Sequence, residues 1–278
     1  MHSSRHNDAM QSQDPRSHHY GQAAHGQSHQ GEVRHGPKGH ERPGAGYAPG
    51  TYVDPRAQLS SGVTAFMTGV FGWMTVGIAL TATIILLLTT VARPVLALFY
   101  TPEGYMTGLG MVAAFAPLLF VFLITSRMET MSQRGARISF LVFSGLFGIA
   151  LADLPLMYNL PSLGGTFVAT TMMFGSVAAY GYFTKKDLSG WGTFLFMAMF
   201  GLMFAFIASA IFGFGSMLLS VLFVLLFAGL TAYKTQTIKQ IYLVQGRQGN
   251  LEVMGALTLY ISFINMFVWV LHLFGSRR

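Results

Sequence analysis

The sequence predicts an all-α integral membrane protein with seven transmembrane helices. Hydrophobic residues make up 52% of the 278 residues and charged residues only 10%, whereas soluble domains carry about 25% charged residues. This balance argues against a soluble enzyme, because so few charges cannot keep a folded surface hydrated. The apolar residues also form long continuous runs instead of alternating segments of about ten residues, which argues against a transmembrane β-barrel.

The first 58 residues differ in composition from the rest and predict a disordered tail. They are rich in His, Gly, Gln, Ser and Pro, contain no Ile, Leu or Phe, and hold all the histidines except His272. Such a segment cannot bury enough apolar surface to offset the entropy lost on ordering. Weak metal binding by the histidines stays open, although their spacing is irregular and no acidic or Cys partner recurs. The segment lacks the apolar core of a signal peptide.

From residue 59 the chain is expected to form one membrane domain. The longest stretch without Asp, Glu, Lys or Arg, from Leu188 to Tyr233, would be roughly 69 Å long as one helix, more than twice a hydrocarbon core of about 30 Å. It must therefore turn, and the sequence Gly-Phe-Gly-Ser at 213–216 is the expected place. The expected spans are 67–91, 107–126, 138–158, 164–183, 191–212, 216–234 and 253–274.

The distribution of the basic residues predicts the orientation in the membrane. Alternate loops on one side hold most of the Lys and Arg residues of the membrane domain, while the opposite side has Arg93 and the C-terminal Arg277 and Arg278. The positive-inside rule places the basic side and the N-terminus in the cytoplasm, and seven spans place the C-terminus outside. Topology accounts for the net charge of +7, so the expected surroundings are the lipid bilayer and no nucleic-acid partner is expected.

Polar residues inside the spans are the candidates for function. Thr258, Ser262, Asn265, Trp269 and His272 follow one another at intervals of three and four residues, so they share one face of the last span. This stripe serves either interhelical hydrogen bonding or the lining of a hydrated path.

Three charged residues lie in or at the ends of the other spans. Asp153 is the acid near the outer end of the third span. Three roles stay open for it: contact with water, capping of a helix, or ion transport. Lys234 ends the sixth expected span and indicates the membrane boundary. Arg127 ends the second span and is expected to pair with Glu129.

The motifs of membrane enzymes are absent from the sequence. It has no His-Glu-x-x-His motif, no paired acids within spans, no phosphate-binding or dinucleotide-binding glycine motif, and no cysteine. We therefore expect no catalysis, no cofactor and no thiolate metal site.

Three motifs resemble the Bax inhibitor-1 family. Residues 180–189 (Tyr-Gly-Tyr-Phe-Thr-Lys-Lys-Asp-Leu-Ser) are similar to the junction of its fourth and fifth spans. Residues 226–239, including Ala-Tyr-Lys-Thr-Gln at 232–236, resemble its sixth span, and residues 255–265 resemble its seventh. The resemblance covers roughly residues 60–278. It implies a central seventh helix wrapped by two three-helix layers. It also implies the bacterial branch of the family and a location in the bacterial inner (plasma) membrane.

The resemblance also implies, for some members, a pH-sensitive calcium leak closed by two aspartates, one ending span six and one within span seven. Two carboxylates that share a proton titrate as a coupled pair. A basic residue at the end of span two is their usual partner, and Arg127 matches it.

The sequence departs from this pattern at both aspartates, which are Lys234 and Ser262 here, whereas Asn265 is kept. A divalent cation requires several anionic oxygens, so calcium binding is not expected. Two functions stay open: a non-enzymatic modulator of membrane protein quality control or of a stress response, partnered by a membrane protease or another membrane protein, and an ion leak with altered gating. Lys234 and Ser262 are expected to face each other near the cytoplasmic end of spans six and seven.

Overall fold

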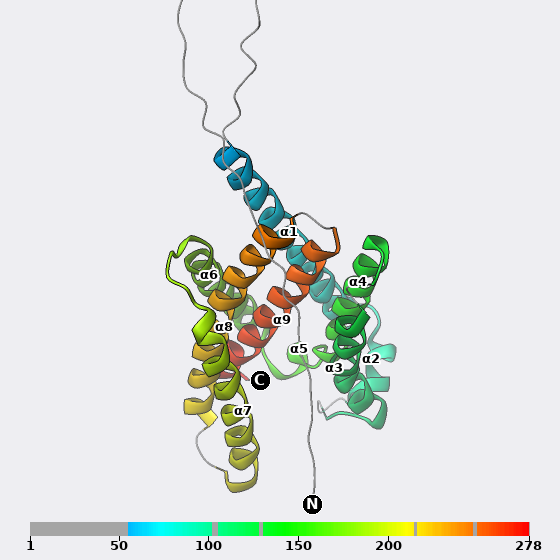
Figure 1. Ribbon diagram of the computed structural model, residues 1–278. Coiled ribbons are helices and arrows are strands. Elements are labelled where there is room, and N and C mark those ends of the chain that lie inside the picture. Colours follow the sequence, from blue (N-terminus) through cyan, green and yellow to red (C-terminus); the bar gives the residue numbers. More distant parts are fainter. Residues whose placement is uncertain (1–54, 102–104, 128–129, 214–215, 247–248, 278) are drawn as a thin grey trace, which may run out of the picture. The chain divides into compact units, whose positions relative to one another are not determined.

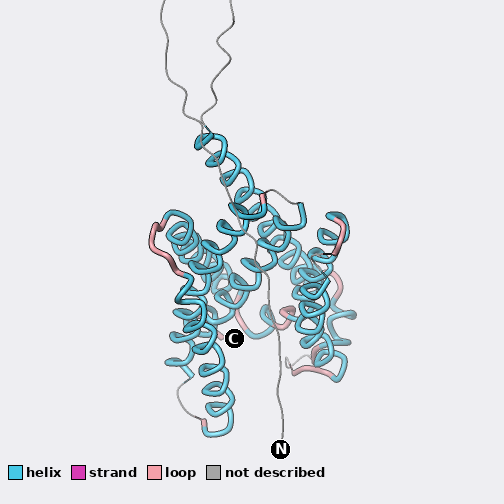
Figure 2. Tube along the Cα trace, viewed as in Figure 1, coloured by secondary structure: helices cyan, strands magenta, loops and turns pink. Residues whose placement is uncertain are grey.

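The structure is a computed structural model that describes residues 55–101, 105–127, 130–213, 216–246 and 249–277. Within these ranges the chain is helical apart from short connections and two isolated bridges, Tyr100 to Met106 and Tyr158 to Arg277 (Figure 2). Seven helical segments of the described chain are long and apolar enough to cross a membrane. The predicted fold class and the predicted number of spans are therefore confirmed.

The helices follow one another along the chain in the order shown in Figure 1. They are α1 (Pro55–Thr90), α2 (Arg93–Phe99), α3 (Gly108–Arg127), α4 (Gln133–Ala150), α5 (Leu154–Met157), α6 (Leu160–Phe183), α7 (Ser189–Phe212), α8 (Ser216–Gln245) and α9 (Gly249–Phe274). The third spanning segment combines α4 with the short α5.

Local sequence signals explain where several helices begin and end. Ser132 caps α4 by accepting a hydrogen bond from the backbone N–H of Gly135 at 3.1 Å, and Asn159 caps α6 in the same way from Ser162 at 2.9 Å. Such side-chain caps satisfy backbone donors that a helix start leaves free. Gly213 ends α7 with φ +71°, a left-handed conformation that glycine adopts without strain. Helix α7 thus ends and α8 begins on either side of the expected turn, of which residues 214–215 lie outside the described residues.

Helix α9 occupies the centre of the membrane domain. It packs against α1 and α4 on one side and against α6 and α8 on the other, while α3 packs on α4 and α7 packs on α8 (Figure 1). In its most apolar part, 61% of the residues of α9 are buried, whereas only 6% are buried in the corresponding part of α7. The layers α1–α3–α4 and α6–α7–α8 therefore enclose the seventh spanning helix, as the family resemblance implies.

Aromatic packing joins α9 to the first layer. Tyr260 is fully buried and meets Phe140, Phe143 and Phe147 of α4 edge to face, with ring centroids 5.7 to 5.9 Å apart. Its hydroxyl lies 2.7 Å from the hydroxyl oxygen of Thr81 on α1. Edge-to-face pairs add stability beyond burial, so this cluster gives α9 a defined position against α1 and α4.

The second layer relies on a close backbone approach between α6 and α8. A Cβ atom at Gly181 would overlap the backbone carbonyl of Ala232. Only glycine leaves room for the two helices at this distance, which is typical of helix packing in membranes.

The C-terminal residues lie against the junction of α5 and α6. The backbone N–H of Ser276 donates to the hydroxyl of Ser162 at 2.9 Å, and the N–H of Asn159 donates to the carbonyl of Ser276 at 3.4 Å. The guanidinium of Arg277 lies 5.9 Å from the ring centre of Tyr158. The end of the last helix is therefore attached to the start of α6.

Two helices extend beyond their predicted spans by eleven residues or more. Helix α1 begins at Pro55 instead of residue 67 and is about 54 Å long, which exceeds a hydrocarbon core of about 30 Å. Helix α8 continues to Gln245, eleven residues beyond the expected end at residue 234. Residues 1–54 of the predicted tail lie outside the described residues, whereas 55–58 belong to the first turn of α1.

Candidate functional site

Lys234 of α8 and Ser262 of α9 face each other, as the family resemblance predicts. The ammonium Nζ of Lys234 donates a hydrogen bond to the hydroxyl oxygen of Ser262 at 3.1 Å. Ser262 is fully buried, and its own hydroxyl donates to the carbonyl of Thr258 at 3.3 Å. The pair therefore joins the centre of the central helix to its neighbour through a charge-assisted hydrogen bond.

Both residues of the pair lie inside their helices instead of at the helix ends. Lys234 lies eleven residues before the end of α8, which is about 16 Å of helix, and Ser262 lies thirteen residues after the start of α9, about 20 Å. Lys234 therefore does not end its helix, and its interpretation as a marker of the membrane boundary stays a prediction. The polar residues after Lys234 continue the helix because they find partners on α6 and on the loop that follows it.

No carboxylate partner for Lys234 is found in the described ranges. These ranges contain three acids: Asp153 lies near the opposite end of the domain, Glu252 is buried with its carboxylate against Gly69, and Asp187 lies in the loop between α6 and α7. Asp187 accepts hydrogen bonds from the backbone N–H and the hydroxyl of Ser189, both at 2.9 Å, which hold the pKa of its carboxyl below the usual value.

The polar stripe of α9 bonds mostly to its own helix. Thr258, Asn265 and His272 each hydrogen-bond to the carbonyl four residues earlier, at 2.8 Å. The indole ring of Trp269 stacks on Phe223 of α8, with ring centroids 4.0 Å apart. Among the described hydrogen bonds of the stripe, the one between Ser262 and Lys234 joins two helices, so interhelical hydrogen bonding is found at one of the five positions.

Arg127 and Asp153 lie apart from the Lys234–Ser262 pair. Arg127 is the exposed last residue of α3, in the layer opposite to that of α8, and Glu129, its expected partner, lies outside the described residues. Asp153 precedes α5 and makes no side-chain cap, although it interacts electrostatically with His272. Of the predicted gate positions Arg127, Asp153, Lys234, Ser262 and Asn265, the structure thus brings together Lys234 and Ser262, with Asn265 one helical turn further along α9.

Sequence reasoning missed a second polar contact on α8. The amide oxygen of Gln236 accepts from the N–H of Leu188 at 2.8 Å, and its Nε2 donates to the carbonyl of Lys186 at 2.8 Å. One turn later, the Nζ of Lys239 donates to the carbonyl of Tyr182 at 2.9 Å and lies 5.0 Å from the centre of that ring. Both residues belong to the motif at 226–239, and this motif is the sequence signal that could have identified them.

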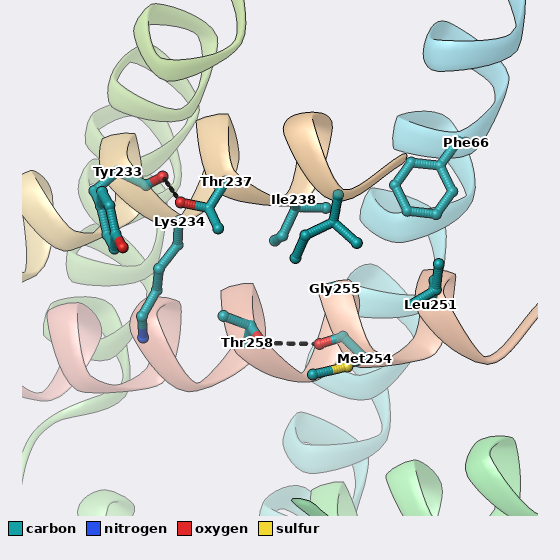
Figure 3. A pocket seen from close by; sticks show the side chains of 10 residues that line it. Phe66, Tyr233, Lys234, Thr237, Ile238, Leu251, Met254, Gly255 and Thr258 are labelled. Carbon is teal, nitrogen blue, oxygen red and sulfur yellow. Dashed lines mark hydrogen bonds between the residues drawn. The ribbon is translucent and has the colours of Figure 1, made fainter. Parts of the chain in front are cut away.

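A cavity of about 170 Å³ lies beside Lys234, between α1, α8 and α9. Figure 3 shows the lysine reaching from α8 toward α9 at one end of the cavity, with Phe66 and Leu251 at the other. The hydroxyls of Thr237 and Thr258 donate to their own helices, so the walls present mainly carbon atoms, with the Lys234 side chain at one end.

These features define a multi-pass α-helical membrane protein whose buried last helix makes a polar contact with the helix before it. The family model described as inhibitor of apoptosis-promoting Bax1 matches residues 63–278. The chain therefore belongs to the Bax inhibitor-1 family.

Several bacterial proteins are similar to this chain over most of their length. The inner membrane protein YbhL of Escherichia coli strain K12 is 36% identical over 237 residues, which cover 81% of this chain and 96% of YbhL. An uncharacterised protein of Caulobacter vibrioides is 35% identical over 244 residues, covering 84% of this chain and 97% of that protein. An uncharacterised protein of Rickettsia prowazekii is 33% identical over 237 residues, with coverages of 82% and 96%.

Proposed function

We propose that this protein is a non-conducting, non-enzymatic component of the bacterial inner membrane that modulates membrane protein quality control or a stress response. The observation that carries the proposal is the hydrogen bond between Lys234 and Ser262, which stand where the family resemblance places two aspartates. The inner-membrane location is supported by the name of the similar protein YbhL.

The charge at this position disfavours a calcium path. Calcium binds to several anionic oxygens, whereas Lys234 presents an ammonium group and Ser262 an uncharged hydroxyl. Two unit charges 4 Å apart interact by about 4 kcal/mol at an effective dielectric constant of about 20, and a divalent ion doubles this repulsion. A calcium ion passing α8 and α9 at this depth would meet a barrier instead of a binding site.

Calcium flux into liposomes tests this proposal. Purified wild-type protein is expected to give no flux above protein-free liposomes at roughly pH 6 and pH 8, the range in which a coupled carboxylate pair titrates. The double variant Lys234→Asp with Ser262→Asp is expected to gain pH-dependent flux that neither single variant gives fully. Acid-sensitive calcium flux in the wild-type protein would contradict the proposal and restore the leak with altered gating.

Isolation of the protein with its partners tests the modulating role. A membrane protease complex, or another membrane protein, is expected to copurify with the intact chain from mild detergent. The control is the same purification after Gly181→Leu, which disrupts the packing of α6 on α8 and should release a specific partner. Recovery of the same proteins with both chains would count against a specific partner.

The proposed orientation has its own test. Helices α3, α6 and α8 end, and α4, α7 and α9 begin, at the end of the domain that carries Lys185 and Lys239, and we propose that this end faces the cytoplasm. Because the chain lacks cysteine, single cysteines at Ser132 and Gly190 should react from the cytoplasmic side, and those at Thr101 and Ser276 from outside. The reverse pattern would invert the orientation.

A further inference from the structure

We propose that the cavity beside Lys234 binds a medium-chain fatty acid, with the carboxylate on the Lys234 ammonium and the alkyl chain along the apolar walls. The proposal deepens the proposed function, because it uses the lysine that replaces a family aspartate and names a ligand that this lysine recognises. Its test measures binding instead of calcium flux, so either idea can fail alone.

The walls of the cavity favour an alkyl chain. Phe66 of α1, Ile238 and Ile241 of α8, and Leu251 and Met254 of α9 line it with carbon atoms (Figure 3). Apolar cavities of about 150 Å³ stay dry and bind benzene, so about 170 Å³ accommodates a chain of about six carbons.

The charge at one end of the cavity favours a carboxylate. An ammonium group has three N–H donors, and the described contacts of Lys234 use one of them, on Ser262. None of the acids in the described ranges pairs with this lysine. A charge held in an apolar environment is costly without a counter-ion, and a monovalent carboxylate supplies that counter-ion with two oxygen acceptors.

The length of the cavity matches a chain that carries its charge at one end. The cavity wall on α8 extends from Lys234 to Ile241, about 10 Å along the helix. The opposite wall on α9 extends from Thr258 back to Leu251, near the start of that helix. A carboxylate on Lys234 would therefore direct its alkyl chain toward the end of the domain where α9 begins.

Binding of radiolabelled octanoate to the full chain in lipid nanodiscs tests the proposal, with empty nanodiscs as the background. The wild-type protein is expected to show saturable binding that unlabelled octanoate displaces. Octanol, which lacks the charge, and acetate, which lacks the chain, are expected to displace it at least tenfold less well. Each methylene of the chain should tighten binding by about fourfold until the cavity is filled.

Two variants assign the binding to this cavity. Lys234→Met removes the charge at nearly constant side-chain length and is expected to weaken binding at least tenfold. Ile241→Trp fills the apolar end and is expected to weaken it similarly without touching the ammonium. Lys239→Met is the matched control, since Lys239 lies on the same helix, contacts Tyr182 and does not line the cavity; its binding should equal that of the wild type.

Three results would overturn the proposal: no saturable binding to the wild-type chain, binding that survives both Lys234→Met and Ile241→Trp, or equal displacement by octanol and octanoate. A melting curve of each variant shows that it is folded. If Lys234→Met does not fold, the comparison of Ile241→Trp with the wild type and of octanol with octanoate still decides the question.

Discussion

Helix α8 places two lysines against the rest of the bundle, and their surroundings are opposite in character. Lys239 has a carbonyl oxygen and the face of an aromatic ring, both from Tyr182, and its neighbour Gln236 has two backbone partners in the loop between α6 and α7. Lys234, one turn earlier, has a single hydroxyl and an apolar cavity. The first region contacts backbone groups and an aromatic ring, whereas the second holds its ammonium on one hydroxyl beside an apolar cavity.

The strongest test of this difference removes the amide of Gln236. Gln236→Ala leaves the N–H of Leu188 and the carbonyl of Lys186 without their partner, so the free energy of unfolding should fall by about 2 to 4 kcal/mol. Thermal or denaturant unfolding in detergent measures this change. Gln240→Ala, an exposed glutamine on the same helix, is the matched control and should change stability by less than about 0.5 kcal/mol. Equal losses in the two variants would contradict a structural role specific to Gln236.

Removing the charge of each lysine should change the free energy of unfolding by a smaller amount, and in opposite directions at Lys239 and Lys234. Lys239→Met removes a charge-assisted hydrogen bond and a cation–π contact and should lower the free energy of unfolding by about 1 to 2 kcal/mol. Lys234→Met removes a cation without a carboxylate partner from the middle of the bundle and should leave stability unchanged or raise it by about 1 kcal/mol. A larger loss from Lys234→Met than from Lys239→Met would show that the two regions do not differ as described.

The smallest effect is expected at Asp187 in the same loop. Its hydrogen bonds from Ser189 lower the pKa of the folded carboxyl, so the stability that it contributes is present above the usual Asp pKa of about 3.9 and is lost as the pH falls through the lower folded value. Asp187→Asn should therefore reduce stability slightly at pH 7. The difference from the wild type should disappear in acid, as melting curves across this range would show; a difference that grows in acid would contradict the assignment.

The sequence predicts the membrane domain well because the signal for a spanning helix lies within the helix itself. Long apolar runs specify spanning helices whatever their neighbours are, so all seven spans follow from the sequence, and the motif around Ser262 predicts its contact with Lys234. The eleven residues of α8 after Lys234 could not be predicted as helix from hydropathy. Their polar groups, Gln236 and Lys239 above all, are compatible with a buried helix only because α6 and its following loop supply partners.

The cavity depends on tertiary packing in the same way. Phe66, Ile238 and Leu251 belong to three different helices, and in the sequence each one is an ordinary apolar residue of a spanning helix. Their convergence around the cavity beside Lys234 follows from how α1, α8 and α9 meet. Sequence patterns on single helices carry no information about such a space, so the predicted site contained Lys234 and Ser262 without the apolar walls beside them.

The attachment of the C-terminal residues to the start of α6 has a mechanical consequence. The bonds of Ser276 to Ser162 and Asn159 lie between the end of α9 and any handle fixed to the C-terminus. A force applied there would first load these contacts and would pass to α6 as well as to α9. In a single-molecule pulling experiment, α9 should therefore leave the bundle only after these contacts break, and Ser162→Ala should lower the force of that first step.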